Sequence, residues 1–328
     1  MSTVISALID GLEFGDPVSD EGLTLVPVFG EFAGLPEFVT LQEAIASRSL
    51  VVTEVSQGGS VPSLSARNAG ATGVLILDGE ELAGAKQNRV LNTSVYIRPG
   101  QEIVIPVSCT EHGRWSYQTS SFVDSGHVSA HAVRLAANES VTKSVRQSGA
   151  FQSDQSRVWD EVALLQERHQ KFSPTSAARD VYESRGEAMR RREASFECLP
   201  GQIGLLALWR GRVAGLDVVT SARAYPKLHN RLVRSYALDA PSGRPSSADH
   251  DRRAAKEWLS SLAAVEVTEH ESPGNGVSYR FTGERVVGSA LAVDGAILHA
   301  VGFATQTGAD RSEERYPGFF ERRANFPW

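Results

Sequence analysis

The sequence is poor in cysteine and has no long apolar run. Its two cysteines, Cys109 and Cys198, are too few for a disulfide framework, and neither stands in a CxxC pair with metal-ligand spacing. No apolar run in the sequence approaches the ~18 residues that a membrane-spanning helix needs. The first residues reach Asp10 and Glu13 without the basic start of a signal peptide. We therefore expect a cytoplasmic protein in a reducing compartment, with no membrane partner.

Positive charge is also scarce. The formal net charge is -6, and affinity for a phosphate backbone needs clustered Lys and Arg, so we expect no nucleic-acid partner. One basic cluster, Arg185 with Arg190–Arg192, we interpret as the solvated face of a helix, in which Glu187 could pair with Arg191. The sequence also lacks GxGxxG, the P-loop pattern, GxSxG, HExxH and an EF-hand loop. These absences exclude the best-known nucleotide, hydrolase and metal motifs.

The first third of the chain has the pattern of strands. Short β-branched runs bounded by Gly, Pro or Ser are typical of strands, and they cover Leu23–Phe29, Leu50–Val55, Gly73–Gly79, Ser94–Ile97 and Glu102–Cys109. Arg98–Gln101 is typical of a turn between two strands. Thr40 and Glu43 have the spacing of a capping box, which predicts a short helix after Thr40.

The middle of the chain changes to helical periodicity. Ser153–Gln170 places its valines and leucines on one face, and Ala132–Val145 and Ser176–Glu197 also favour helices. The last third returns to strands, with helices expected over Tyr225–Ala240 and His250–Ala264. Strand-rich N- and C-terminal parts around a helical middle predict an α+β fold made mostly of antiparallel hairpins. The lack of regular βα alternation argues against a Rossmann or barrel fold.

One pattern occurs three times: an apolar run, a tight turn ending in glycine, and a second apolar run. The copies are VLILDGEELAG, LLALWRGRVAG and ALAVDGAILHA. Asp-Gly favours the type I′ turn of a two-residue hairpin loop. We therefore predict three β-hairpins, which indicate sheet content and not a function.

The densest group of ionic and amide side chains lies between Asp78 and Trp115. Two polar clusters flank apolar strands there; their members are Glu80, Glu81, Lys86, Gln87, Asn88 and Arg89 in the first, and Cys109, Glu111, His112, Arg114 and Trp115 in the second. If the strands on either side of Pro99 and Gly100 pair, Arg89 comes close to Glu111. We therefore expect the two clusters to face each other.

The residue types in these clusters fit a site for a nucleotide-derived ligand. Carboxylates can act as general acid, general base or metal ligand, basic groups can hold phosphate, and an indole can stack on a base. The alternative is a polar sheet end held together by salt bridges such as Glu81 to Arg89 or Glu111 to Arg114. The residue types leave both interpretations open and identify no metal or cofactor.

Cys109 is a candidate nucleophile, with His112 three residues after it. On a strand, however, positions 109 and 111 share a face and His112 points away, so a buried structural cysteine is the alternative. His127 and His131 have the spacing of a helical metal pair but lack the glutamate of the zinc-protease pattern. We interpret His299 as a packed or hydrogen-bonded side chain.

Several segments together carry a family resemblance. GEELAGAKQNR, IPVSCTEHGRW, GLDVV, LVRSYALDA and GSALAVDGAILHAVGF resemble a bacterial domain family named for its association with ADP-ribosylglycohydrolases and rhodanese-like phosphatases. The resemblance spans residues 20–304 and implies a single family domain. That domain could form two lobes, with residues 1–130 mainly β and residues 131–328 α+β.

The resemblance singles out motif positions and implies a role. The motif positions are Glu80, Glu81, Gly84, Gln87, Asn88, Arg89, Cys109, Glu111, Arg114 and Trp115. The implied role concerns an ADP-ribose-like or other phosphorylated nucleoside-derived metabolite in a bacterial stress or conflict pathway, with an ADP-ribosylglycohydrolase or phosphatase as functional partner. Together with the residue types, it makes Glu80, Glu81 and Glu111 the catalytic candidates, and the ligand-binding candidates are Lys86, Gln87, Asn88, Arg89, Arg114 and Trp115. Whether the ligand is turned over stays open, and a non-catalytic interaction protein that regulates a partner enzyme is the alternative.

Overall fold

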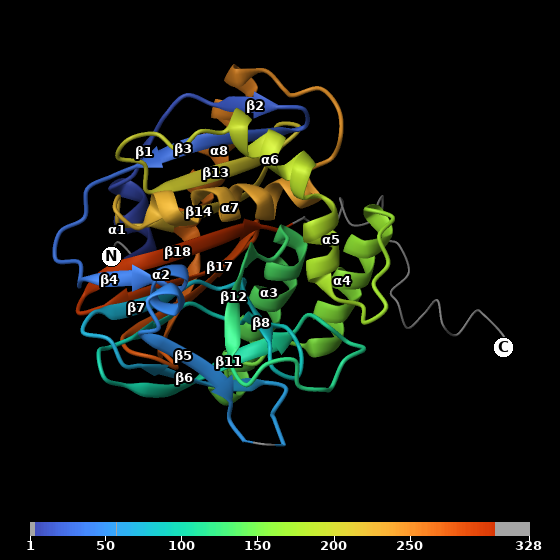
Figure 1. Cartoon of the computed structure of the whole chain (residues 1–328). Coiled ribbons are helices and arrows are strands. Elements are labelled where there is room, and N and C mark those ends of the chain that lie inside the picture. The colour runs from blue at the N-terminus through green and yellow to red at the C-terminus, as the bar shows by residue number, and fades with distance from the viewer. Residues whose placement is uncertain (1–3, 57, 306–328) are drawn as a thin grey trace.

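The computed structural model describes residues 4–56 and 58–305. In that part of the chain, eight α-helices and three β-sheets form the α+β fold expected from the sequence (Figure 1). The helices are α1 (Val4–Asp10), α2 (Leu41–Ala46), α3 (His131–Ser148), α4 (Gln155–Arg168), α5 (Ala178–Ser184), α6 (Gly186–Ser195), α7 (Tyr225–Asp239) and α8 (Ala248–Ser261), with a 3-10 turn η1 (Leu262–Ala264) after α8. The strands are β1 (Glu13–Phe14), β2 (Val18–Asp20), β3 (Leu23–Phe29), β4 (Phe38–Thr40), β5 (Leu50–Glu54), β6 (Ser63–Asn68), β7 (Gly73–Ile76), β8 (Glu80–Gly84), β9 (Arg89–Leu91), β10 (Val95–Ile97), β11 (Glu102–Cys109), β12 (Phe122–Val128), β13 (Gly204–Trp209), β14 (Arg212–Val219), β15 (Glu266–Glu271), β16 (Val277–Gly283), β17 (Val286–Val293) and β18 (Ala296–Ala304).

Most elements expected from the sequence are present. β3 and β11 have the expected bounds, and the helical middle consists of α3 to α6. The stretch Ser176–Glu197 is divided at Arg185 into α5 and α6. The capping box of α2 is confirmed, because Glu43 N donates to Thr40 Oγ1 at 3.4 Å and Thr40 N donates to Glu43 Oε2 at 2.9 Å. None of the helices in the described ranges combines the length and the apolar surface that crossing a membrane requires.

The main sheet joins the two ends of the chain. Its strand order is β1-β3-β13-β14-β18-β17-β16-β15, with β2 also paired to β3. β3 lies antiparallel to β13, with Leu25 opposite Ala207. Figure 1 shows this pairing as a blue strand beside a yellow one. The start of the chain and its last third therefore build one sheet.

Helices cover both faces of the main sheet because its central strands are apolar on both sides. Along β13, Leu205 and Ala207 share a core with α7, whereas Leu206 and Leu208 share a second core with α1 and α8. Successive strand residues point to opposite faces. A continuous apolar run such as GLLAL therefore marks a strand buried on both sides.

The other two sheets enclose a third core. The six-stranded sheet has the order β12-β8-β9-β11-β6-β5, and the three-stranded sheet has the order β10-β7-β4, in which β4 and β7 are parallel. Leu41 of α2, Leu64, Ile76 and Ile105 are among the side chains of this core. The polar motif lies on β8, β9 and β11 and on the segments that follow β8 and β11, so the six-stranded sheet carries the predicted site.

Two of the three predicted hairpins are confirmed. β13 and β14 pair through Arg210 and Gly211, and β17 and β18 pair through Asp294 and Gly295. Both central residues of each turn have positive φ, as a type I′ turn requires. The hairpin predicted at Gly79 is wrong, because β7 and β8 belong to different sheets.

Local contacts explain why the chain changes sheets at Gly79. Glu80 Oε2 accepts from Leu77 N at 2.8 Å, and Gly79 N donates to Leu91 O at 2.9 Å, which ties the turn to β9. Gly79 has a φ of +79°, and a Cβ there would lie 2.8 Å from Cγ and Cδ of Arg134. Only glycine fits this turn without strain.

The strand pairing expected through Pro99 and Gly100 is also wrong. β10 pairs with β7, and β11 pairs with β6 and β9. The reason lies in β6, where Asn68 Nδ2 donates to the carbonyl oxygens of Ile97 and Arg98 at 3.1 and 3.2 Å. These bonds hold the turn next to β6, so β11 continues along β6 instead of folding back on β10.

Candidate functional site

The two polar clusters meet across β9 and β11. Arg89 of β9 lies opposite Cys109 of β11. Beyond this pair, Thr110 N donates to Asn88 O at 3.1 Å, and Asn88 N donates to Glu111 Oε2 at 3.1 Å. The clusters therefore face each other, although β9 brings them together and the turn before β11 does not.

Glu111 and Arg114 form a closed ion pair. Arg114 donates from Nε to Glu111 Oε1 at 2.9 Å and from Nη2 to Oε2 at 2.5 Å. Its Nη1 donates to the carbonyl oxygens of Ala85 and Ser116 at 2.8 and 3.0 Å. Burial would raise the pKa of Glu111, but the bonds from Arg114 and Asn88 outweigh burial and lower it. This ion pair holds the loop after β11 against the turn between β8 and β9.

Glu80 and Glu81 are fully buried and bind different partners. Glu80 Oε1 lies 3.2 Å from Nη1 of Arg231 in α7, and Glu81 Oε1 accepts from the Thr110 hydroxyl at 2.9 Å. Burial raises the pKa of each carboxyl to about 7. Each group could therefore exchange a proton near neutral pH. The ion pair suggested between Glu81 and Arg89 does not fit, because Glu81 and Arg89 point to opposite faces of their sheet.

Arg89 is buried and makes little use of its donors. Its Nη1 donates to Gln87 Oε1 at 2.8 Å, whereas no partner within residues 4–56 and 58–305 meets its Nε or Nη2. We call such an atom open, meaning that no hydrogen-bond partner for it lies in the described ranges. Both carboxylate oxygens of Glu54 are open in the same sense. Burial lowers the pKa of Arg89, while the neighbouring Cys109 and Glu54 act in the opposite direction.

Trp115 and Lys86 lie next to Arg89. Arg89 Cζ is 5.7 Å from the centre of the Trp115 ring, and Lys86 Nζ is 5.1 Å from the ring centres of both Trp115 and Tyr117. Lys86 Nζ also donates to Gly58 O at 2.6 Å. Trp115 is 48% exposed, so part of its ring faces solvent. We refer to the following residues together as the Arg89 site: Glu54, Lys86, Arg89, Cys109 and Trp115.

Cys109 is held as a thiol. Its Sγ lies 3.2 Å from Gln87 Oε1 and 3.1 Å from Glu111 O, and the single S–H proton can be donated to one of these oxygens at a time. Burial raises the pKa of the thiol, which disfavours the thiolate that a nucleophile needs. His112 packs edge-on against Trp159, with 4.3 Å between the ring centres. A nucleophilic role for Cys109 therefore stays a prediction.

The two histidines considered as a metal pair belong to different elements. His127 lies in β12 and His131 begins α3. His131 Nε2 lies 3.0 Å from Ala214 O, and burial lowers the pKa of His127 to about 4. Among residues 4–56 and 58–305, no group of three or more His, Cys, Asp or Glu side chains is arranged to hold a metal ion.

A second buried ionic group lies beneath α3, and no motif in the sequence predicts it. Arg134 of α3 donates to both oxygens of Asp217 in β14 at 2.6 and 3.0 Å, and its Nη2 is 3.4 Å from Asp78 Oδ1. Tyr236 donates to Asp217 Oδ2 at 2.6 Å, and His299 Nε2 is 3.5 Å from Asp217 Oδ1. Burial would raise the pKa of Asp217, but Arg134 outweighs burial and holds it well below the usual range. The one hint in the sequence is the single charge inside the apolar strand GLDVV.

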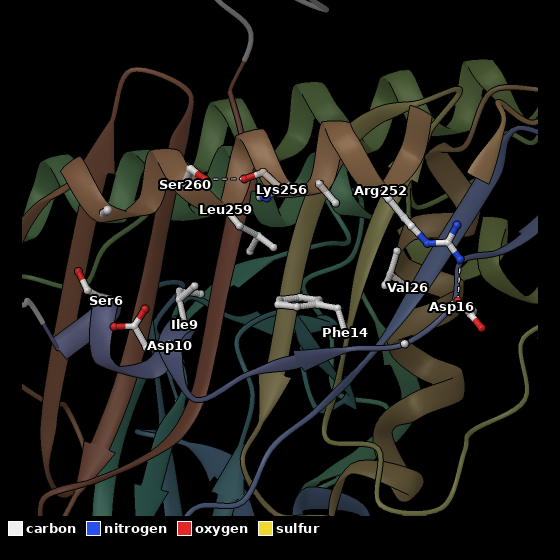
Figure 2. Close-up of a pocket in the computed structure, with 13 residues that line it drawn as sticks. Ser6, Ile9, Asp10, Phe14, Asp16, Val26, Arg252, Lys256, Leu259 and Ser260 are labelled. Carbon is white, nitrogen blue, oxygen red and sulfur yellow. Dashed lines mark hydrogen bonds and ion pairs between the residues drawn. The ribbon is translucent and has the colours of Figure 1, made fainter. Parts of the chain in front are cut away.

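An apolar groove of about 500 Å³ lies apart from both clusters, between α1, β1 and α8 (Figure 2). Ile9, Phe14 and Leu259 line it, and Arg252 at its edge pairs with Asp16 at 2.6 Å. All of its lining residues come from α1, β1 to β3, α8 and the chain next to them. This groove is therefore separate from the predicted site.

The fold and the motif define a class of α+β protein: a large antiparallel sheet is covered by helices on both faces and is joined to two smaller sheets, of which the six-stranded one carries a buried polar motif. The chain belongs to a particular family, because residues 11–303 match the model of the ARG and Rhodanese-Phosphatase-superfamily-associated Protein domain. The family resemblance carried by the motifs is thereby confirmed over most of the chain. No curated protein and no solved structure matches the chain.

Proposed function

We propose that the protein binds an ADP-ribose-like or other phosphorylated nucleoside-derived metabolite at the Arg89 site. The observation that carries the proposal is the buried guanidinium of Arg89, whose Nε and Nη2 are open within the described ranges. A buried donor without an acceptor is costly, and a phosphate supplies oxygens in the geometry that a guanidinium prefers. The partly exposed ring of Trp115 offers a surface on which a base can stack.

The remaining residues of the motif divide into ligand-binding and positioning roles. Lys86 adds a second positive charge beside Trp115, and the carboxylate of Glu54 can accept from ribose hydroxyls. Gln87 holds Arg89 through Nη1, while Asn88 Oδ1 accepts from Gly84 N at 3.2 Å. Arg114, whose bonds go to Glu111 and to backbone carbonyls, would position the loop that carries Trp115.

Binding without turnover is the simpler form of the proposal. Glu80 is paired with Arg231, Glu111 is paired with Arg114, and Glu81 lies on the other face of the sheet from Arg89. The family description names an association with ARG and with the rhodanese-phosphatase superfamily. That association supports a shared pathway in which an ADP-ribosylglycohydrolase or a phosphatase is the functional partner.

The second candidate function is a non-catalytic interaction protein that regulates a partner enzyme. The observation in its favour is the closed ion pair of Glu111 and Arg114, together with the Glu80–Arg231 pair. Groups paired in this way stabilise a loop and two elements without any ligand. In this alternative the motif locks the end of the sheet, and a surface elsewhere on the molecule meets the partner.

Thermal unfolding of the full chain with ADP-ribose, AMP and ribose 5-phosphate separates the two candidates. We expect ADP-ribose to raise the Tm in a saturable manner. Stacking on an aromatic ring contributes about 1–3 kcal/mol per base, so Trp115→Ala should weaken binding roughly 10- to 100-fold. Arg89→Met should abolish the response.

Phe172→Ala is the matched control, because Phe172 is 73% exposed and lies outside the motif. It should leave the response to ADP-ribose unchanged. The absence of any saturable response, or a full response in both Trp115→Ala and Arg89→Met, would contradict the metabolite site. That result would favour the interaction protein.

A further inference from the structure

A line of side chains crosses the face of the main sheet that lies under α3. The register of four adjacent strands places Asp217 of β14, Val301 of β18, Ser289 of β17 and Arg280 of β16 opposite one another. Residues directly opposite in neighbouring strands point to the same face. We call these residues the interior row.

α3 places polar side chains over the interior row at every fourth position. Arg134, Asn138 and Thr142 share one face of the helix. Arg134 binds Asp217 at one end of the row, and Asn138 Nδ2 donates to Ser289 Oγ in its middle at 3.1 Å. In the described part of the chain, no partner meets Oδ1 of Asn138 or Oγ1 of Thr142. Hydrogen-bonding capacity is therefore unused along this face of α3.

Arg280 is the member of the interior row whose charge and hydrogen-bond donors have the fewest partners. It is fully buried, and none of its three guanidinium nitrogens has a hydrogen-bond partner among residues 4–56 and 58–305. The centre of the Phe151 ring lies 5.5 Å from its Cζ. Asp78 is the carboxylate whose charge acts on Arg280, but Arg134 already binds Asp78 at 3.4 Å. Burial lowers the pKa of Arg280 to about 10, so the guanidinium is still charged at neutral pH.

A groove lies between α3 and the hairpin of β16 and β17, and the buried Arg280 is not among its lining residues. It has a volume of about 490 Å³, and we call it the α3 groove; its lining includes Thr142, Lys143, Thr282 and Val287. Thr282 and Val287 lie opposite each other in the two strands. Thr282 is two residues from Arg280 on the same face, which corresponds to ~7 Å along a strand. The lining residue Thr282 therefore lies two positions along β16 from Arg280, whose guanidinium nitrogens have no partner in the described ranges.

We propose that the inner end of the α3 groove binds an oxyanion, the phosphate or carboxylate group of a small ligand, through Arg280. Two ionised oxygens accept from a guanidinium in a fork, and such bonds are about twice as strong as neutral ones. The hydroxyl of Thr142 can donate to the oxyanion, and the groove lining carries both basic residues, Lys143 and Arg146, and acidic ones, Glu139 and Glu284. The metabolite site proposed above consists of other residues, so this inference does not depend on it.

The test is thermal unfolding of the full chain with inorganic phosphate and, separately, acetate, at constant ionic strength. The two anions distinguish a phosphate ligand from a carboxylate ligand. We expect at least one of them to raise the Tm in a saturable manner, and Arg280→Met to abolish that response. Arg280→Lys keeps the charge but lacks the fork, so it should weaken binding about 10-fold or more.

Thr142→Leu obstructs the floor of the groove and breaks no hydrogen bond known within the described ranges, so it should fold and bind the anion less well. Arg252→Met is the matched control, because it removes a guanidinium away from both the α3 groove and the Arg89 site, and it should keep the response. The proposal is overturned if neither anion gives a saturable response, or if the response survives in both Arg280→Met and Thr142→Leu. If Arg280→Met does not fold, Arg280→Lys and Thr142→Leu decide the outcome.

Discussion

The motif region contains one buried arginine that is paired and one that is not, and so does the interior row together with the face of α3 that covers it. In the motif, Arg114 is held by Glu111, whereas Arg89 has open nitrogens within the described ranges. Beneath α3, Arg134 is held by Asp217, whereas Arg280 has no direct partner in that same part of the chain. Removing one member of a buried ion pair destabilises the fold, because the charge left behind is uncompensated. A buried charge without a partner in the protein points to a ligand that would supply one.

The largest test of this comparison is the pair Arg134→Met and Arg280→Met. Removing Arg134 leaves Asp217 and Asp78 as uncompensated buried carboxylates, so we expect the free energy of unfolding to fall by about 3–5 kcal/mol. Arg280→Met removes a buried charge that makes no hydrogen bond within the described residues, so it should leave the free energy of unfolding unchanged or raise it. Urea unfolding measures both values. Equal losses in the free energy of unfolding would contradict the distinction between a paired Arg134 and an unpaired Arg280.

Arg114→Met and Arg89→Met repeat the comparison in the motif. Arg114→Met leaves the buried Glu111 and several carbonyl oxygens without donors, so a loss of about 2–4 kcal/mol is expected. Arg89→Met loses the single bond to Gln87 and should cost about 1 kcal/mol or less. Urea unfolding without ligand again gives the measurement. A larger loss from Arg89→Met would mean that Arg89 supports the fold.

The buried carboxyl of Glu81 makes the stability of the protein depend on pH. Burial raises its pKa from 4.5 to about 7, so between these values the folded state binds a proton more tightly than the unfolded state. The stability contributed by this proton is fully present below pH 4.5 and is lost as the pH rises through 7. We expect Glu81→Gln, which cannot ionise, to reduce the loss of stability between about pH 5 and pH 7.5 by on the order of 1–3 kcal/mol.

Urea unfolding at the two pH values measures the slope for Glu81→Gln. Part of the slope should remain, because burial also raises the pKa of Glu80 to about 7. Glu187→Gln is the control, since Glu187 is exposed on α6 and should not change the slope. An unchanged slope in Glu81→Gln would show that its carboxyl is ionised in the folded protein.

The smallest expected difference concerns two buried threonines. Thr24 Oγ1 donates to Asp251 Oδ2 at 3.1 Å, whereas Thr142 Oγ1 is open within the described ranges. Replacing each by valine changes only the hydroxyl, so Thr24→Val should cost about 1–2 kcal/mol and Thr142→Val about zero. Thermal unfolding without anions gives both values. A clear loss from Thr142→Val would reveal a partner for that hydroxyl.

Elements fixed by neighbouring residues could be predicted from the sequence. The capping box of α2 depends on Thr40 and Glu43 alone, and the turn at Asp294 and Gly295 depends on the conformations those two residues adopt. The same Asp-Gly pair at Gly79 does not form a hairpin. There, the bonds to Leu77 and Leu91 and the packing of Arg134 determine the conformation of the turn. Arg134 is distant from this turn in sequence, so no local pattern reveals its contribution.

The same distinction holds for the candidate sites. Glu111 and Arg114 are three residues apart, so their ion pair could be suggested from the sequence. The facing of the two clusters was also expected, but the pairing of β9 with β11 that produces it was not. The interior row depends on the register of four strands, and Arg280 takes its environment from the neighbouring strands, from Phe151 and from the charge of Asp78. A single sequence contains no local pattern for such an arrangement.

The pairing of β3 with β13 has a consequence for how the chain folds during synthesis. β3 emerges early from the ribosome, but the strand on its other side, β13, follows only after the whole motif region and the helical middle have been made. Closing so long a loop is slow, and until then the edge of the apolar segment LTLVPVF that faces away from β1 and β2 has no partner strand. Pro27 within this segment lacks an N–H and so weakens unwanted strand pairing with other chains. We therefore expect that replacing Pro27 increases the aggregation of newly made chains before it has any effect on the folded protein.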